Sequence, residues 1–433
     1  MKEGTGEDNV YQQYHTPVGQ ITREQLKLKH AGATKRYIGL DLSKQSCYVC
    51  IINKQGEVEK HRSYSMRSNQ RHKLYETLQA GDVVLMEAST GTFNIARALN
   101  KLSGVVACVI NPHTTRINET KKKTDKEDSL FLARLIARTP VVELSLVSIP
   151  SDQEMANRET ISYYQHLKKQ HTQGINRMHA LFYEKGFPEA GKAYNLHTKG
   201  GRAAAIEKYI GSDRVLATTK RLLKGYSKQL TLLEQQMESE DTQFAKIVKQ
   251  DDRTAAILGS IPGVGLKSIA AFIAFVGDIN RFSSAKQLAS YCGLVPRVSQ
   301  SGQKNSTGKI TKEGQAALRE YLVEAVLTIQ NTKFDFPLKR KYLEMKQRMN
   351  GRKAAVAIAK KLVTIMYSML KNGTVFFVEK EEERKAIATY QSRKRIQSLG
   401  GYYKICNSCK EYSEMVRTTN TLHSNEIGVL KFI

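Results

Sequence analysis

The sequence predicts a protein of mixed class, with an α/β domain at its N-terminus and all-α domains after it. Segments of β type alternate with helical segments up to about residue 150, and long stretches with helical periodicity follow. Of the 433 residues, 40% are apolar and 25% are charged, which is typical of globular chains. A chain of this length suits two or three domains.

Three successive strands are expected at the start of the α/β domain. They cover Tyr37–Leu42, Ser46–Asn53 and Glu57–Tyr64, with Gln55-Gly56 as the second turn. The later elements of this domain are a helix at Asn69–Leu78, a strand at Val83–Met86, a helix from Gly91 to about Leu102 and a strand at Val105–Ile110. Three meandering strands followed by alternating helices and strands describe a mixed sheet, in the order of an RNase H-like fold.

Five segments are expected along the chain. They are a polar leader (1–35), the α/β domain (36–150), a helical coiled-coil arm (151–252), a mainly helical C-terminal domain (253–378) and a charged tail (379–433). We expect the tail to be a solvated appendage, because its EKEEERK run and its YQSRKRIQ segment are strongly charged.

The arm contains apolar residues at spacings of three and four, which predict a coiled-coil seam. The seam residues are Leu216, Thr219, Leu223, Tyr226, Leu230, Leu233 and Met237. We expect Gly186-Phe187-Pro188 and Lys199-Gly200-Gly201 to mark the loop between two helices. Barely three heptads leave two interpretations open, an internal helical hairpin and a dimerisation arm.

The charge balance indicates a polyanionic partner. The chain has 68 Lys and Arg against 41 Asp and Glu, a net charge of +27. Basic clusters interspersed with aromatic residues favour nucleic acid. No apolar run approaches the ~20 residues that span a bilayer, and the first 20 residues lack the apolar core of a signal peptide. We therefore expect no membrane association and a cytoplasmic location.

The six cysteines are too few in so long a chain for a disulfide framework, which fits a reducing compartment. Cys47 and Cys50 lie three residues apart in a predicted strand, so their side chains point to opposite faces and a shared metal is not expected. Cys406 and Cys409 form a second CxxC pair, for which zinc is a weakly supported alternative because no partner pair is in reach.

Two acidic residues end predicted strands, and two more begin a helix. Asp41 ends the first strand in IGLD, and Glu87 ends the fourth in VVLMEASTGT. Asp125 and Asp128 lie in KKKTDKEDSLFLARLIA and share one helical face. Because the first and fourth strands are neighbours in an RNase H-like sheet, we expect the four carboxylates to converge. Their repulsion predicts a divalent cation, and hard oxygen ligands favour Mg²⁺, with Mn²⁺ as an alternative.

A simpler explanation exists for the acids of the helix. Thr124 and Glu127 form a capping box, so an acid in this first turn could merely stabilise the helix dipole. Glu127 should point away from the pair. The four acids together are stronger evidence for a metal site than any single acid of the helix, because apolar strands do not need terminal acids in order to fold. Lys123, just before the pair, is a candidate phosphate contact.

The order of these motifs resembles a known family. IGLD, MEASTGT, INP and KTDKEDS occur in sequence as in the N-terminal RuvC-like domain of the insertion-sequence one-ten family of transposases. This family includes the pilin-gene-inverting recombinases. The resemblance implies catalytic, metal-binding roles for the DEDD set, which is Asp41, Glu87, Asp125 and Asp128.

The C-terminal domain opens with IPGVGLKS, the turn of a helix-hairpin-helix. Gly263 and Gly265 expose backbone N–H groups at a helix N-terminus, which suits a phosphate, and Lys267 follows them as a further candidate contact. A glycine-rich turn between helices can equally serve close packing, so this alternative stays open.

A loop rich in Gly, Ser and Lys follows, in GLVPRVSQSGQKNSTGKITKEG. Its candidate nucleic-acid contacts are Arg297, Lys304, Lys309 and Lys312. Spacing alone does not choose among Ser299, Ser301 and Ser306. GLVPRVSQSG is similar to a block of the C-terminal domain of the same transposase family, in which the serine before the glycine is the nucleophile. The resemblance, which covers roughly residues 36–375, therefore implies Ser301.

The resemblance also implies a mechanism and partners. Magnesium held by the carboxylates would activate a phosphodiester of double-stranded DNA, and Ser301 would form a phosphoserine link that allows rejoining. Active sites in the family are composite and form within a tetramer, so a dimer to tetramer is expected. Family membership implies a structured bridge RNA that pairs with donor and target DNA. The basic excess suits binding of both backbones.

Two other functions remain open. The first is a metal-dependent nuclease or junction resolvase that uses water, with Ser301 only a loop residue. The second is a non-enzymatic RNA-binding scaffold with a degenerate nuclease fold.

Overall fold

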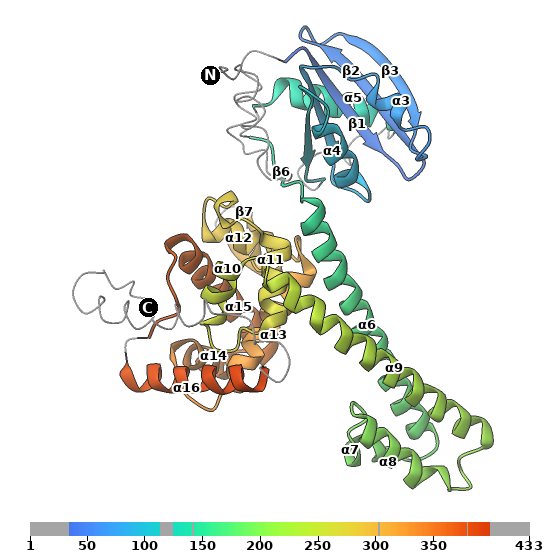
Figure 1. Cartoon of the computed structure of the whole chain (residues 1–433), viewed down its shortest axis with the longest axis vertical. Coiled ribbons are helices and arrows are strands. Elements are labelled where there is room, and N and C mark those ends of the chain that lie inside the picture. The colour runs from blue at the N-terminus through green and yellow to red at the C-terminus, as the bar shows by residue number, and fades with distance from the viewer. Residues whose placement is uncertain (1–33, 113–123, 141–142, 302–303, 379, 399–433) are drawn as a thin grey trace, which may run out of the picture. The chain divides into compact units, whose positions relative to one another are not determined.

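The structure, a computed structural model, describes residues 34–112, 124–140, 143–301, 304–378 and 380–398 (Figure 1). The chain divides into two compact units, Met1–Ala156 and Asn157–Ile433. Within the described ranges, no helix combines the length and the apolar character needed to cross a membrane.

The N-terminal unit is built on a six-stranded mixed sheet with the order β3-β2-β1-β4-β5-β6. The strands are β1 (Arg36–Leu42), β2 (Ser46–Asn53), β3 (Val58–Ser65), β4 (Asp82–Glu87), β5 (Val106–Ile110) and β6 (Leu146–Val147). Strands β1, β4 and β5 are parallel to one another, while β2, β3 and β6 run antiparallel to their neighbours. The expected mixed sheet, with the first and fourth strands as neighbours, is confirmed.

Helices cover both faces of this sheet (Figure 1). Helix α4 (Thr92–Asn100) and the short α3 (His72–Tyr75) supply Ile95, Leu99 and Leu74 to the core on one face. On the other face, α5 (Asp125–Arg138) packs Leu132 and Ile136 against β4 and β5. Apolar residues on both sides of the central strands explain why these strands are continuous hydrophobic runs.

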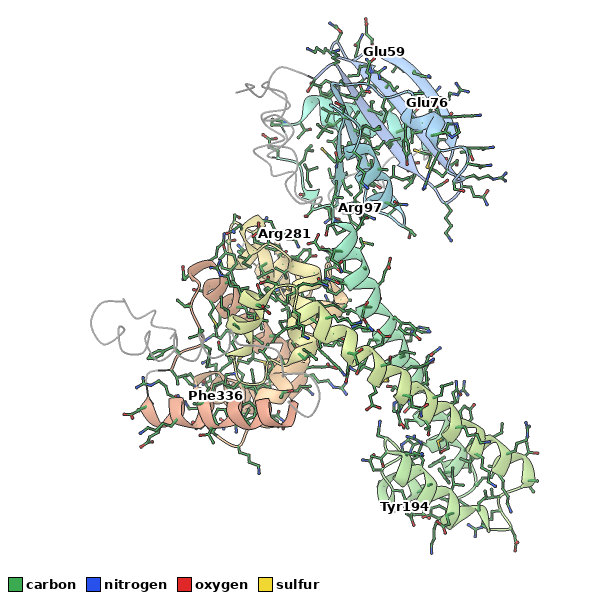
Figure 2. The ribbon with its side chains drawn as sticks, in the orientation of Figure 1. Glu59, Glu76, Arg97, Tyr194, Arg281 and Phe336 are labelled. Carbon is green, nitrogen blue, oxygen red and sulfur yellow. The ribbon has the colours of Figure 1, made fainter. Side chains whose placement is uncertain are left out.

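Arg97 of α4 fixes the chain where it leaves the sheet (Figure 2). Its guanidinium donates to the carbonyl oxygen of Pro150 at 3.1 Å and pairs with the Asp152 carboxylate at 2.7 Å. Because Asp152 begins the long helix α6 (Asp152–Glu184), this contact sets the start of the helix.

The arm of the second unit is an internal helical hairpin. Helices α6 and α9 (Ala217–Val248) share one apolar core with the short helices α7 (Ala190–Ala193) and α8 (Lys199–Ile210) (Figure 1). The predicted seam residues Leu223, Leu230 and Leu233 are buried in this core, which confirms the seam within one chain. Leu216 was predicted wrongly, because it is the N-cap of α9 and is 65% exposed.

The expected loop at Lys199-Gly200-Gly201 is also wrong. These residues begin α8, whose N-cap Thr198 accepts a hydrogen bond from the backbone N–H of Gly201 at 3.1 Å. A capping hydroxyl and the alanines that follow offset the low helix propensity of the two glycines.

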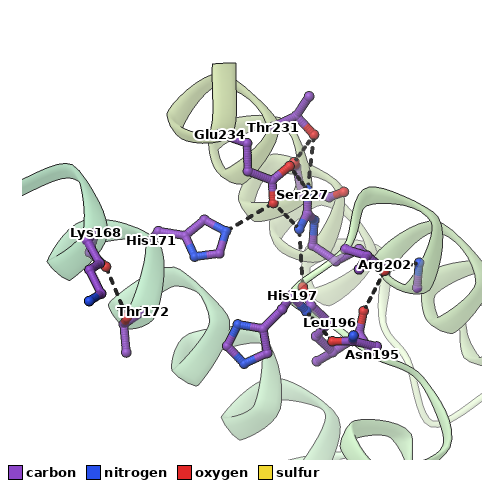
Figure 3. A network of polar contacts seen from close by, with 12 residues as sticks. Lys168, His171, Thr172, Asn195, Leu196, His197, Arg202, Ser227, Thr231 and Glu234 are labelled. Carbon is purple, nitrogen blue, oxygen red and sulfur yellow. Dashed lines mark hydrogen bonds and ion pairs between the residues drawn. The ribbon is translucent and has the colours of Figure 1, made fainter. Parts of the chain in front are cut away.

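A buried ion pair ties α8 to α9 (Figure 3). The guanidinium of Arg202 is fully buried and binds the Glu234 carboxylate at 2.6 and 2.7 Å. His171 of α6 lies 3.0 Å from the same carboxylate. Although partial burial raises the pKa of Glu234, hydrogen bonds from Arg202 and His171 outweigh it and hold this pKa below its usual value. Three helices therefore meet at one charged group.

The C-terminal domain is a helical bundle with one large apolar core. Its elements are α10 (Asp252–Gly259), α11 (Leu266–Val276), η2 (Ile279–Arg281), α12 (Ala285–Tyr291), β7 (Pro296–Ser301), β8 (Lys304–Ile310), α13 (Ala316–Gln330), α14 (Pro337–Arg348), α15 (Gly351–Asn372) and α16 (Glu381–Ser398). The mainly helical character predicted for residues 253–378 is confirmed.

Two local expectations for this domain are corrected. The segment expected to be an open loop is largely an antiparallel pair of strands, β7 and β8. The start of the expected solvated tail is the helix α16, which buries Ile387 and pairs Glu383 with Arg340 at 2.8 Å. A single buried isoleucine in a charged run gives almost no periodic signal, so the sequence pattern did not reveal the docking.

We predict that Glu234→Gln destabilises the arm by about 3 kcal/mol, because it leaves the buried Arg202 charge without its partner. Urea unfolding followed by circular dichroism measures this loss. Glu238→Gln, one turn further along α9 and exposed, is the matched control and should change stability little. A double Arg202→Met, Glu234→Met variant should recover much of the loss. Equal stability of Glu234→Gln and the control would contradict the prediction.

Candidate active site

Asp41 and Glu87 lie at the same level of neighbouring parallel strands. The register pairs Gly39 with Leu85 and Leu40 with Met86, so the next residues are Asp41 and Glu87. Side chains alternate along a strand, so Asp41 shares the face of Gly39, and Glu87 shares the face of Leu85. That face is the one that α5 covers, because Leu85 packs with residues of α5.

The direction of α5 brings its first turn to this end of the sheet. A Cβ atom on Gly39 would lie 1.9 Å from the Ser129 carbonyl oxygen, so the helix backbone touches the strand there. Tyr37, two residues earlier on β1, packs near Ala137, later on α5. The helix therefore runs antiparallel to β1, and its N-terminal turn lies toward the end of β1 that carries Asp41.

The first turn of α5 carries the other two predicted carboxylates. Thr124 is the N-cap, and its hydroxyl accepts from the backbone N–H of Glu127 at 3.3 Å, as the capping pattern predicts. Asp128 is 9% exposed, whereas Asp125 and Glu127 are exposed. A buried acid is not needed for capping by Thr124. Lys123 lies outside the described residues.

The donor set fits a hard divalent cation by its chemistry. All four predicted ligands offer carboxylate oxygens, which Mg²⁺ and Mn²⁺ prefer. As the side chains stand, no three His, Cys, Asp or Glu side chains among the described residues gather closely enough to hold an ion. The backbone therefore brings the four acids to one face and one end of the sheet, but the structure does not gather three of their side chains at one point.

The nearby thiols do not compete as ligands. Cys47 belongs to the core on the α4 face and Cys50 to the core on the α5 face, so the prediction that they point apart is confirmed. Burial, and then the nearby Asp41 carboxylate, raise the pKa of the Cys47 thiol far above its ordinary value. Burial raises the pKa of Cys50 to about 11. Both stay protonated at neutral pH. Cys406 and Cys409 lie outside the described residues.

The sequence analysis missed His61, which lies beside the helix of the carboxylates. Its Nε2 atom is 3.4 Å from the Ser129 hydroxyl, and its ring packs edge-on against Tyr48, which pairs with Asp41 across the sheet. Burial, and then the Lys126 ammonium group, lower the pKa of His61. The alternation of side chains along β3 could have revealed His61, because it places this residue on the face of the sheet that α5 covers.

The glycines of the helix-hairpin-helix turn have different environments. Gly263 has φ +89°, and a Cβ there would lie 2.5 Å from a side-chain carbon of Ile329, so this glycine serves close packing. Gly265 is the N-cap of α11, and a Cβ there would meet nothing within 4 Å. The Lys267 ammonium group contacts Asp241 at 2.8 Å and the Tyr164 hydroxyl at 2.5 Å. Of the three predicted phosphate contacts in this turn, Gly265 is therefore the one that neither close packing nor an internal ion pair already explains.

The predicted serine ends strand β7. The register places Ser301 opposite Lys304, and Ser299 opposite Ser306. Arg297 lies on β7, and Lys309 lies on β8. Lys312, just beyond β8, is exposed and has a left-handed backbone with φ 57°. Such strain in a non-glycine residue often accompanies a functional position. The carboxylates and Ser301 belong to different compact units.

Comparison with known protein families identifies both regions. A profile described as a transposase, for the DEDD domain of the IS110 type, matches residues 38–185. A second, described as "Transposase IS116/IS110/IS902 family", matches residues 255–344. The chain belongs to the IS110/IS116/IS902 family of transposases. Transposases of this family cut and rejoin DNA, so the chain is an enzyme that acts on DNA.

Individual relatives agree with this assignment. The transposase is 26% identical, over 77% of its length and 89% of the relative's, to "Transposase for insertion sequence element IS1111A" of Coxiella burnetii. It is also 26% identical to the "Pilin gene-inverting protein" of Moraxella bovis, over 79% of its own length and 98% of the relative's. A "Probable family 20 transposase" of Pseudomonas aeruginosa shows the same identity over 78% and 98%.

Proposed function

We propose that this transposase cuts and rejoins double-stranded DNA with four carboxylates that hold a divalent metal and with Ser301 as the nucleophile. The register of β1 and β4 supports the first part most directly. It sets Asp41 and Glu87 side by side on the face that the Asp125–Arg138 helix covers. A bound Mg²⁺ would polarise the scissile phosphate and stabilise charge on its oxygens.

The carboxylates have separable tasks in this proposal. Asp41 and Glu87 come from rigid central strands, so they would fix the position of the metal. Asp128, largely buried, would be held in one orientation by its surroundings, whereas the exposed Asp125 can adjust when DNA arrives. Four acids at one place repel one another, so the site gains free energy when a cation enters.

Ser301 would make the covalent link. Its Oγ atom attacks the phosphorus, the Oγ–P bond forms, and the P–O bond to the leaving DNA hydroxyl breaks. The serine loses one proton and the leaving hydroxyl gains one, so no net proton is consumed. The phosphodiester bond energy is kept, and the reverse attack by another DNA hydroxyl rejoins the strand. Lys304, opposite Ser301 in the register, would bind the phosphate.

We predict that Asp41→Asn, Glu87→Gln, Asp125→Asn and Asp128→Asn each lower DNA cleavage in Mg²⁺ at least about a hundredfold, equivalent to about 3 kcal/mol. EDTA should abolish the wild-type activity, and Mn²⁺ should restore it. Cleavage of a labelled DNA substrate on a denaturing gel measures the effect. Glu127→Gln, in the same helical turn, is the matched control and should cut normally. Undiminished cleavage by Asp41→Asn and Asp128→Asn would refute the carboxylate site.

Ser301→Ala should remove the covalent protein–DNA adduct and lower strand rejoining by about 10⁴-fold or more, as loss of a nucleophile does. A DNA substrate nicked beside the cleavage point traps the adduct, which is then detected after denaturation. Ser299→Ala, two residues earlier on the same strand, is the control and should still form it. If Ser301→Ala cut DNA as well as the wild type, a metal-dependent nuclease that uses water would be the better interpretation.

We also propose that the transposase works as a homo-oligomer, a dimer to tetramer, with a structured guide RNA. Two features support this. The carboxylates and Ser301 lie in separate units, so the complete site can combine different protomers. A net charge of +27 suits binding to the phosphate backbones of both DNA and RNA.

Purification of the transposase with its native element should recover one discrete structured RNA, in a particle that contains two to four protomers for each assembly, as the family resemblance implies. Sequencing identifies the RNA, and light scattering gives the mass of the particle before and after ribonuclease treatment. Recovery of random cellular RNA with a monomeric protein would count against both the guide and the assembly.

A further inference from the structure

A hollow on the N-terminal unit lies apart from the carboxylates. It has a volume of about 460 Å³ and lies between strand β3 and the segment around α3. We call it the β3–α3 groove, lined by residues Arg62–Ser65 and by Gln70, Lys73, Glu76 and Thr77. Figure 2 labels Glu76, one of the lining residues.

The charge around the groove is almost entirely positive. Residues 60–75 contain five Lys or Arg and no Asp or Glu. Arg62 and Lys73 line the groove, and within the described part of the chain neither has a carboxylate within salt-bridge distance. Glu76 is the one acid in the lining. Two cations without acidic partners in a hollow attract an anion more strongly than scattered surface cations do.

The groove also has the other groups that phosphate and sugar oxygens need. Gln70, Ser63 and Ser65 offer polar side chains. The Arg62 guanidinium lies 5.6 Å from the centre of the Tyr64 ring, a cation–π contact that limits its orientations. Among the described strands, β3 is at the edge of the sheet, so its outer backbone groups pair with no other described strand.

The groove lies at the same end of the sheet as the carboxylates. Tyr64 pairs with Cys47, and Cys47 pairs with Leu42, the residue after Asp41. Along the sheet, two strand spacings separate β3 from β1, roughly 10 Å. The groove opens on the face of α3, where Tyr64 is buried, whereas Asp41 and Glu87 lie on the face of α5, so the thickness of the sheet also separates the two places. Both places border the same end of the sheet, so one duplex that lies across that end can contact both.

We infer that the β3–α3 groove is a second DNA contact of the transposase, which binds the phosphate backbone of the duplex away from the phosphate at the carboxylates. The partner is duplex DNA, bound by charge and by hydrogen bonds to phosphate. This inference rests on the proposed function for the position of the cut phosphate. It assigns to Arg62 and Lys73 a role in binding and none in the chemical step.

The test measures the affinity of the full-length chain for a fluorescent random-sequence DNA duplex at several salt concentrations, without divalent metal. Arg62→Gln with Lys73→Gln should raise Kd and lower the slope of log K against log salt by about 2, because two phosphate contacts are lost. Glu76→Gln removes a negative charge from the groove and should lower Kd. Cleavage in a single turnover with saturating DNA should stay at the wild-type rate.

The matched control is Lys54→Gln with Lys101→Gln. It removes the same charge from exposed positions at the opposite end of the same sheet, in the β2–β3 turn and after α4, and should leave the salt slope nearly unchanged. Circular dichroism confirms the fold of each variant.

Salt slopes equal to those of the control would overturn the inference, as would a change in affinity for single-stranded RNA of the same length without a change for DNA. The wild type and Asp41→Asn, assayed together for cleavage, test the proposed function separately. If only the wild type cleaves and the salt slope of the double variant is unaltered, the groove is wrong and the carboxylate site stands. If the salt slope is altered and Asp41→Asn cleaves as well as the wild type, the carboxylate site is wrong and the groove stands.

Discussion

The close contact of the Asp125–Arg138 helix with strand β1 at Gly39 is the constraint on which the candidate active site depends. The helix backbone at Ser129 lies where a Cβ atom of residue 39 would be, so any side chain there must push the helix away from the sheet. Two of the four carboxylates come from the sheet and two from the helix. Their separation is therefore set by a backbone-to-backbone distance that only glycine permits. The requirement here is for space and not for an unusual φ angle.

Sequence patterns predicted the elements that have strong local signals. The strands at Ser46–Asn53 and Asp82–Glu87 are apolar runs bounded by turn residues, and the N-cap at Thr124 has its own chemistry, so all three were expected nearly as they occur. The β7–β8 pair was missed because its strands are polar and lack alternation. Helix α8 was missed because two glycines suggest a turn, while its stability depends on Arg202, which meets Glu234 only in the folded chain. The closeness of Asp41 and Glu87 followed from the fold class, whereas the groove at Arg62 and Lys73 depends on tertiary packing that no local pattern reports.

The positive charge of the transposase is divided between structural and exposed uses. Arg36 forms two hydrogen bonds with Asp82, a fully buried acid, at 2.7 and 2.9 Å. Arg202 and Lys267 likewise form ion pairs, with the partly exposed Glu234 and Asp241. Cations of this kind stabilise the fold and contribute little to an external field, because their partners cancel them at short range. Composition alone therefore overstates the charge that faces DNA, and the location of cations without partners is the better guide to where a backbone binds.

The two candidate catalytic elements depend on different hydrophobic cores. The carboxylates are placed by the cores on the two faces of the sheet, while the strand that carries Ser301 belongs to the helical domain with its own core. A substitution that removes a carboxylate should therefore leave the serine hairpin folded, and the reverse should also hold. This independence makes loss of activity at either place interpretable as lost chemistry. In the proposed mechanism, each of the two elements therefore keeps its own fold whether or not the other has engaged the phosphate.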